Sequence, residues 1–209
     1  IEAIVLSPDM KLLISGAEDT TVKLWNVEAG KLVRTIEGHE GPIKIISLTL
    51  DGSKLASGGA DNVIRVWDTE TGFLVKSLPG HSNGIQTVEF SPDSKSLVSG
   101  GYDKTLRLWD ISTGRIMRTF AATDYVSVAA FSPDGQFIAS GGNDKAVTLW
   151  NASTGKLEQR LLGFTDKVEA VSFSPDGTLL VAGSRGAGVH IWDHRTGRLL
   201  RTHQASKVR

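Results

Sequence analysis

The chain has 209 residues, in which 23 Lys plus Arg balance 23 Asp plus Glu, and it contains no cysteine. The absence of net charge argues against nonspecific binding to nucleic acid or to an anionic membrane surface, because neither would meet an attractive field. The lack of cysteine excludes disulfides, zinc–thiolate sites and haem attachment through Cys-x-x-Cys-His. Apolar runs are too short for a membrane helix of roughly 20 residues and no targeting segment is recognisable, so we expect a soluble, cytoplasmic protein.

Five tryptophans divide the chain into copies of one unit. They stand at positions 25, 67, 109, 150 and 192, which gives steps of 42, 42, 41 and 42 residues. Each ends a short β-branched run and precedes Asp or Asn. We therefore expect a single domain over residues 1–209, with copies at 1–36, 43–78, 85–120, 126–162 and 168–203 and a short tail at 204–209.

Each copy begins with a strand and a tight turn. In the second copy the first strand is expected from Ile43 to Leu48, and its apolar positions change parity between Ile43 and Ile46, which indicates a β-bulge. Later copies continue with turns such as Ser132-Pro133-Asp134-Gly135, where Pro presets φ and Gly accepts a positive φ. The turn predicts an antiparallel pair of strands.

Two further strands complete the unit. The second strand ends in Ser57-Gly58, a loop carries Asp61, and the third strand ends at Trp67 with Arg65 on the same face. A turn that ends in Gly72 reverses the chain into an outer strand. One such four-stranded meander cannot bury both of its faces, so the copies must stack, and radial stacking of an all-β chain gives a propeller with short, protected edges.

A period near 42 residues, with Trp-Asp closing a strand, resembles the WD-repeat β-propeller family, and the resemblance covers essentially the whole chain. It implies four-stranded antiparallel blades, five of them in this chain, whereas rings of the family usually have seven. Residue 1 already lies inside a first strand and the last copy finishes its own outer strand. We therefore expect part of a larger, seven-bladed ring, whose end copies expose apolar surface that favours association.

The resemblance also implies a buried relay, in which the indole N–H bonds a Ser hydroxyl, the hydroxyl bonds an imidazole, and the imidazole bonds a carboxylate. Two copies carry the full set: His39, Ser57, Asp61 and Trp67 in the second, and His81, Ser99, Asp103 and Trp109 in the third. The same residue types make a Ser-His-Asp nucleophilic triad. A hydroxyl bonded to a buried indole cannot reach a substrate, and no Gly-x-Ser-x-Gly elbow is present, so we expect no catalytic residue and no enzyme.

The fourth and fifth copies depart from this pattern. The fourth has Ala121-Ala122 in place of Gly-His but keeps Ser140 and Asp144. The fifth replaces His, Ser and Asp by Phe164, Ala182 and Gly186, which predicts that Trp192 is held by packing alone. His190 and His194 do not share a helical face as a metal-binding pair would, so we interpret them as solvated histidines and expect no metal and no cofactor.

Family members bind proteins and peptides on the top face, where the loops entering the first and third strands converge. Matched residue by residue, the resemblance assigns this role to Glu2, Glu18, Lys44, Gln86, Tyr102, Tyr125, Ser127, Asn143, Lys167, Glu169 and Arg185. Both tyrosines of the chain are in this set, which favours a binding centre between copies three and four. Glu2 and Glu18 predict an acidic first sector, and Lys167 and Arg185 beside Glu169 predict a mildly basic fifth sector.

These patterns favour a non-catalytic scaffold module that binds a protein or peptide partner. One alternative is the sensor or scaffold repeat region of a larger multidomain signalling protein, such as an NTPase or kinase. A second alternative is a propeller hydrolase, because Ser-Pro-Asp-Gly is similar to the Asp boxes of sialidase propellers. The Thr-Trp that should follow such a box is absent, and no Arg cluster for a carboxylate accompanies it.

Overall fold

The structure is a computed structural model that describes residues 1–186 and 188–204. Its strands form five four-stranded antiparallel sheets, each made of four consecutive strands. The first sheet contains β1 (Ala3–Leu6), β2 (Leu12–Gly16), β3 (Val22–Asn26) and β4 (Lys31–Ile36). The second contains β5 (Ile43–Leu48), β6 (Lys54–Gly59), β7 (Val63–Asp68) and β8 (Leu74–Pro79). The third contains β9 (Ile85–Phe90), β10 (Ser96–Gly101), β11 (Thr105–Asp110) and β12 (Ile116–Ala121). The fourth contains β13 (Val126–Phe131), β14 (Phe137–Gly142), β15 (Val147–Asn151) and β16 (Leu157–Leu161). The fifth contains β17 (Val168–Phe173), β18 (Leu179–Ser184), β19 (Gly188–Asp193) and β20 (Leu199–His203).

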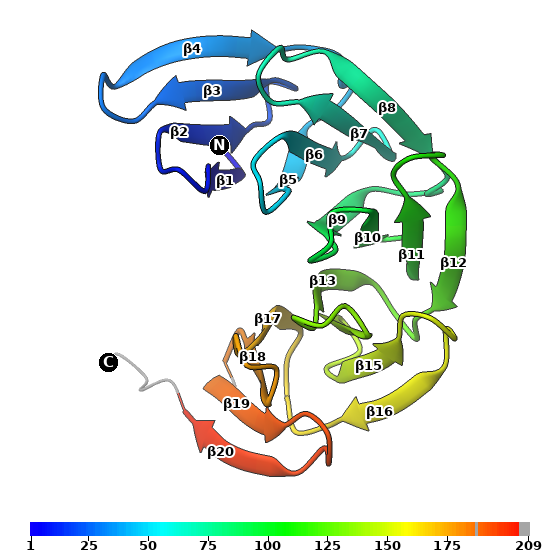
Figure 1. The fold of residues 1–209 in the computed structure, drawn as a ribbon. Helices are drawn as coiled ribbons and strands as arrows, with labels where there is room; N and C mark the ends of the chain where they lie inside the picture. Colours follow the sequence, from blue (N-terminus) through cyan, green and yellow to red (C-terminus); the bar gives the residue numbers. More distant parts are fainter. Residues whose placement is uncertain (187, 205–209) are drawn as a thin grey trace.

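The sheets confirm the predicted all-β architecture of four-stranded blades. Figure 1 shows them side by side around an open arc, with β1, β5, β9, β13 and β17 toward the centre and the fourth strand of each sheet at the rim. The first and fifth sheets lie at the two ends of the arc. The chain is thus a partial β-propeller. No helix in the described part of the chain is long and apolar enough to cross a membrane.

The predicted bulge in the first strand is present in the second, third, fourth and fifth copies. The register of β5 against β6 shifts between Ile43 and Ile45. The shift brings Gly59 so close to the preceding loop that a Cβ there would lie 2.0 Å from the Pro42 carbonyl oxygen, so no other residue fits without moving the backbone. The next amide, that of Ala60, donates to the same oxygen at 2.9 Å. The bulge therefore sets the direction of the loop before β5 and of the turn after β6, which meet at this edge of the sheet.

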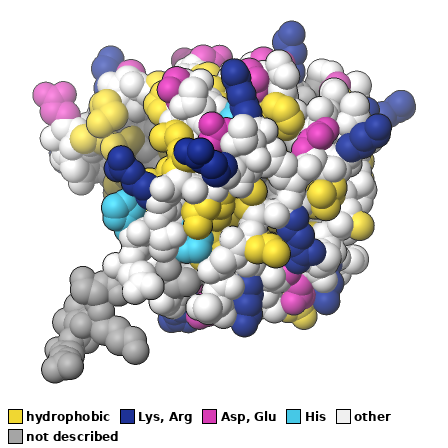
Figure 2. Space-filling view, turned by 90° about the horizontal axis from the view of Figure 1, so that it is seen from below, with side chains coloured by type: hydrophobic (Ala, Val, Ile, Leu, Met, Phe, Trp, Pro, Cys, Tyr) yellow, Lys and Arg dark blue, Asp and Glu magenta, His cyan; other side chains and the backbone are white. Residues whose placement is uncertain are grey.

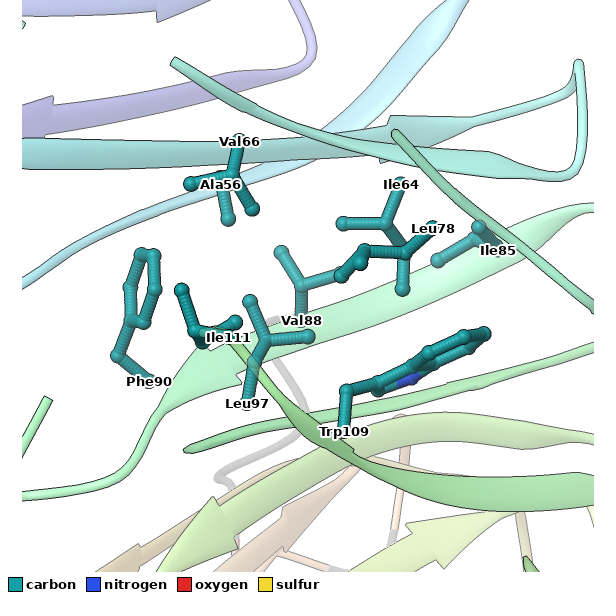
Figure 3. Close-up of a cluster of buried hydrophobic side chains, with 10 residues drawn as sticks. All are labelled: Ala56, Ile64, Val66, Leu78, Ile85, Val88, Phe90, Leu97, Trp109 and Ile111. Atoms are coloured by element: carbon teal, nitrogen blue, oxygen red, sulfur yellow. The ribbon is translucent and has the colours of Figure 1, made fainter. Parts of the chain in front are cut away.

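The hydrophobic cores lie between neighbouring sheets. Figure 3 shows one of them: Trp109 of the third sheet packs against Ile64 and Leu78 of the second, with Val88 and Leu97 of its own sheet beside them. Trp67, Trp150 and Trp192 pack in the same way against the sheet that precedes each of them. Each indole thus fills the space between two sheets, and each sheet relies on a neighbour for its core.

The two end faces of the arc lack such a neighbour. Ile4 of the first sheet is 64% exposed, whereas Val88 at the same position of the third sheet is 4% exposed. At the other end, Val189 is 39% exposed, whereas the corresponding Ile64 is fully buried. Trp25 is also only half-buried. The apolar exposure predicted for the first and last copies is present.

A long polar side chain joins neighbouring sheets at the rim. Arg34 of the first sheet donates to the Glu70 carbonyl of the second at 3.3 Å, and Lys76 donates to the Ser112 carbonyl of the third at 3.3 Å. Gln159 occupies the same repeat position in the fourth sheet and donates to the His194 carbonyl of the fifth at 3.2 Å. These contacts link neighbouring sheets at the edge where the apolar core ends.

The difference between internal and terminal tryptophans gives a first prediction. Trp109→Ala removes a side chain that is 1% exposed and should lower the free energy of unfolding by about 3–5 kcal/mol, through lost packing and the cavity that remains. Trp25→Ala removes the half-buried indole and should cost clearly less. Urea denaturation of both variants measures the two losses. Equal losses would contradict the placement of the cores between sheets.

Candidate functional site

The structure brings the two predicted relays together with nearly identical geometry. In the third sheet, Trp109 Nε1 donates to Ser99 Oγ at 2.8 Å, Ser99 Oγ lies 2.7 Å from His81 Nε2, and His81 Nδ1 lies 2.8 Å from Asp103 Oδ2. In the second sheet, the corresponding distances are 2.8 Å from Trp67 to Ser57, 2.7 Å from Ser57 to His39, and 2.8 Å from His39 to Asp61. Both histidines and both serines are buried.

One assignment of protons satisfies every member of the relay. His81 donates its Nδ1–H to Asp103 and accepts the Ser99 hydroxyl proton at Nε2, and Ser99 Oγ then accepts the Trp109 N–H. Ser99 is fully buried and its one proton is already used. The buried hydroxyl therefore has no access to a substrate, and its bond to the Trp109 N–H gives the relay a structural role in positioning the indole.

The charge states follow from burial and hydrogen bonding. Burial lowers the pKa of His81 and outweighs the raising effect of Asp103, so the imidazole is neutral at pH 7. Burial alone would raise the pKa of Asp61, but hydrogen bonds from His39, the Glu40 N–H and Arg65 hold it below its usual range. The carboxylate stays ionised and fixes the imidazole tautomer.

The fourth copy keeps only part of the relay. Trp150 Nε1 still donates to Ser140 Oγ at 2.8 Å. The loop before β13 is one residue shorter than its counterpart before β9. The strand registers place Ala122 at the position of Gly80 and Thr123 at that of His81, so the expected match of Ala121-Ala122 to Gly-His is wrong by one residue. Asp144 instead accepts hydrogen bonds from Thr123 and, at 2.9 Å, from Arg160. The Asp144 carboxylate is therefore hydrogen-bonded even though this copy lacks the histidine.

The interpretation of His190 and His194 as solvated histidines is wrong, because both are buried. His190 stacks on Phe164 with ring centroids 4.3 Å apart, and Trp192 packs edge-on against both rings. His194 lies edge-on to Phe137 and Phe173 and lines a cavity of about 530 Å³ between the fourth and fifth sheets. Among residues 1–186 and 188–204, no group of three or more His, Cys, Asp or Glu side chains could hold a metal ion.

Seven of the residues assigned to partner binding line one pocket of about 320 Å³, here called the upper pocket: Gln86, Tyr102, Tyr125, Ser127, Asn143, Lys167 and Glu169. The two tyrosines come from different sheets and meet edge to face, with ring centroids 5.3 Å apart. Tyr102 is 44% exposed and Tyr125 is 41% exposed. The pocket thus presents two rings that are fixed by each other and open to solvent.

Ion pairs neutralise the charges at this pocket. Lys104 Nζ lies 5.2 Å from the centre of the Tyr125 ring and 3.1 Å from Asp124 Oδ1. Asn143 Nδ2 donates to the other Asp124 oxygen at 2.8 Å, and Lys167 pairs with Glu169 at 2.9 Å. The side view in Figure 2 also shows positive and negative side chains interspersed. The phenol hydroxyls and amide groups, rather than net charge, are available for a partner.

The remaining predicted residues lie outside the upper pocket. Glu2 and Glu18 pair with Lys44, which lies 3.0 Å and 3.7 Å away from them. A single lysine from the next sheet thus offsets one of the two negative charges, so the first sector stays acidic but less so than the two glutamates alone predict. Arg185 is exposed in the turn after β18.

Sequence reasoning did not single out Lys104 or Asp124. Lys104 follows the relay residue Asp103 in a turn where its φ is 60°, a position that most copies fill with polar residues. Asp124 lies in the shortened loop before β13, so the 41-residue step was the one signal that marked this segment as different.

Comparisons with known proteins agree with this geometry. A family model described as the IFT122 first beta-propeller matches residues 1–150, and a WD domain, G-beta repeat model matches residues 155–193. The chain belongs to the WD-repeat β-propeller family. This WD-repeat chain is similar to the general transcriptional corepressor TUP1 of Saccharomyces cerevisiae, with 42% identity over 43 residues, which is 21% of this chain and 6% of TUP1.

Two further relatives show the same partial coverage. The nuclear distribution protein PAC1 of Tuber melanosporum is 44% identical over 39 residues, 19% of this chain and 9% of PAC1. A Lissencephaly-1 homolog of Monosiga brevicollis is 31% identical over 52 residues, 25% of this chain and 13% of that protein. The similarity thus spans single repeats and a small part of each relative's length.

The relay geometry predicts the effect of removing its histidine. His81→Ala leaves the buried Asp103 carboxylate and Ser99 hydroxyl short of a partner, and should lower the free energy of unfolding by about 1–3 kcal/mol. His203→Ala, at an exposed position of β20, is the control and should change stability little. Chemical denaturation compares the two. A His81→Ala protein as stable as the parent would show that the relay contributes nothing.

The buried fifth-copy histidine predicts a dependence on pH. Burial lowers the pKa of His190 below the usual 6.5, so below pH 6.5 the unfolded chain binds more protons than the folded one. The contribution of the neutral His190 to the free energy of unfolding is fully present above pH 6.5 and is lost as the pH falls below it. His190→Phe keeps an aromatic ring against Phe164 and should flatten the loss between pH 7.5 and 5.5, as measured by urea denaturation. An unchanged slope would show that His190 does not titrate in this range.

Proposed function

We propose that this chain is a non-catalytic scaffold module that binds a protein or peptide at the upper pocket. One observation carries the proposal: the two tyrosines of the chain, brought from loops of neighbouring sheets, meet edge to face and remain more than two-fifths exposed. Tyrosine is enriched among the residues that dominate binding energy, because it offers a large rigid ring with a polar end. Mutual packing lowers the entropy that each ring loses on binding.

The surroundings of the tyrosines define the partner. Paired charges ring the pocket, so a partner with an apolar or aromatic centre and a mixed-charge rim fits it better than a uniformly charged one. Gln86, Ser127 and Asn143 add hydroxyl and amide groups that can bond to a peptide backbone. The same site would serve a repeat region of a larger signalling protein, whose other parts would carry the activity.

The open faces of the arc are a separate surface. Ile4 in β1 and Val189 in β19 belong to the first and fifth sheets, which lie at the two ends of the arc, and their exposure favours association through these sheets. In a binding experiment the parent and each variant must therefore have the same oligomeric state, which size-exclusion chromatography of each protein checks.

The test uses peptides selected against the parent protein from a display library. Replacement of both Tyr102 and Tyr125 by Ala should weaken the selected peptides by at least about 2 kcal/mol, roughly 30-fold in Kd, while the fold remains intact. Phe73→Ala is the matched control, because it removes an exposed aromatic ring at the rim, where Phe73 is 75% exposed. Isothermal titration measures the affinities. Peptides that bind the double variant as tightly as the parent would refute the assignment of this pocket.

A further inference from the structure

A second pocket lies at the opposite end of β9. Whereas Gln86 near the start of this strand lines the upper pocket, Glu89 near its end lines a pocket of about 340 Å³, here called the lower pocket. Its walls come from three neighbouring sheets and are largely apolar, with Leu48, Leu50, Phe90, Pro92 and Pro133 among them. Glu89 is its one charged lining residue.

The Glu89 carboxyl has no cationic partner among the described residues. Its Oε1 accepts a long hydrogen bond of 3.4 Å from the Phe131 N–H, and no other hydrogen bond reaches the carboxyl in that part of the chain. The strands packed against β9 are β5, β6, β10 and β13, and their charged side chains are Lys44 and Lys54. Lys44 pairs with Glu2 and Glu18, and Lys54 forms no ion pair with Glu89. One carboxylate oxygen is thus left for a ligand.

The fold does not require a carboxylate at this position. The other copies have Val5, Ser47, Ala130 and Ser172 there. Ser47 accepts the Phe90 N–H at 3.3 Å, so a hydroxyl already makes the bond to the next sheet that Glu89 makes. Burial raises the pKa of Glu89 to about 7, which measures the cost of holding this charge without a partner. A costly group that the scaffold does not need is a mark of a binding site.

We propose that the lower pocket binds an organic cation, a guanidinium or ammonium group on an apolar stem, through an ion pair with Glu89. The apolar walls cover the stem, as they do for the methylene chains of Arg and Lys in proteins. The free carboxylate oxygen accepts a charge-assisted hydrogen bond from the cation. The ligand supplies the charge that the sheets around Glu89 lack.

The cation binds the ionised carboxylate, which gives the site a characteristic pH dependence. With a pKa of about 7, Glu89 is mostly protonated at pH 6 and mostly ionised at pH 8. Affinity should therefore rise roughly tenfold between these two pH values, and binding near pH 7 should release protons. The hydrogen bond with Glu2 raises the pKa of Lys44, so this side chain stays charged throughout the range and does not produce the change.

The experiment is a titration followed by NMR, with the Phe131 amide as reporter because it bonds to Glu89. The probes are n-butylguanidinium, an acetylated and amidated Gly-Arg-Gly peptide, and n-butylurea as the neutral analogue. Glu89→Gln removes the charge and keeps the shape, and Glu70→Gln removes one charge from an exposed turn. The parent and Glu70→Gln should bind the cations saturably and n-butylurea at least tenfold more weakly, whereas Glu89→Gln should lose at least tenfold in affinity for the cations.

Two comparisons separate the possible outcomes. A peptide that binds at least tenfold more tightly than n-butylguanidinium identifies the ligand as an Arg side chain of a partner, and equal affinities identify a free small cation. Undiminished cation binding by Glu89→Gln, equal binding of n-butylurea, or an affinity independent of pH in the parent overturns the proposal. If Glu89→Gln fails to fold, the pH dependence of the parent's affinity for the cations still tests the proposal. Replacement of both tyrosines by Ala should leave this binding unchanged, so the two pockets are tested independently.

Discussion

The contact on which the structure depends is the packing of each indole against the preceding sheet. Trp67, Trp109, Trp150 and Trp192 all lie in cores that two sheets build together. A sheet four strands wide cannot cover its own two faces, so this shared core is what turns a string of hairpins into one body. In the second and third copies the relay holds the indole in position through its N–H. At the rim, polar side chains form hydrogen bonds across the same interface between sheets. The polar side chains of the relay and of the rim therefore support the apolar interface between sheets.

The sequence predicts the fold well because the period and the strand pattern are local. The change of parity between Ile43 and Ile46 indicates a bulge, and the register of β5 on β6 shifts there. The relay positions were assigned through a family resemblance, and the structure places the four residues in the expected bonding order, Trp109 to Ser99 to His81 to Asp103. These features repeat, so each copy supports the interpretation of the others.

The parts that sequence reasoning missed depend on tertiary contacts that one copy makes and the others do not. His190 is buried because Phe164 stacks on it, and His194 is buried because Phe137 and Phe173 from two sheets close on it. The acidic sector predicted from Glu2 and Glu18 is weakened because Lys44, from the next sheet, lies 3.0 Å from Glu2. A repeat predicts what its members share, whereas these pairs involve residues that only one copy has. Glu89 belongs to the same class, and comparison of the copies at its position was the signal available.

The fourth unit is shorter than the others, and this limits the directions from which a partner can dock. Five equal units around an axis would present five equivalent docking directions and would permit several partners at once, each at a different angle. The shortened loop before β13 carries Asp124 and Tyr125, and the aromatic pair occurs at one junction between sheets. The rotational pseudo-symmetry is broken at that junction, so a partner of the proposed site would meet one such junction per arc, at one azimuth around the axis.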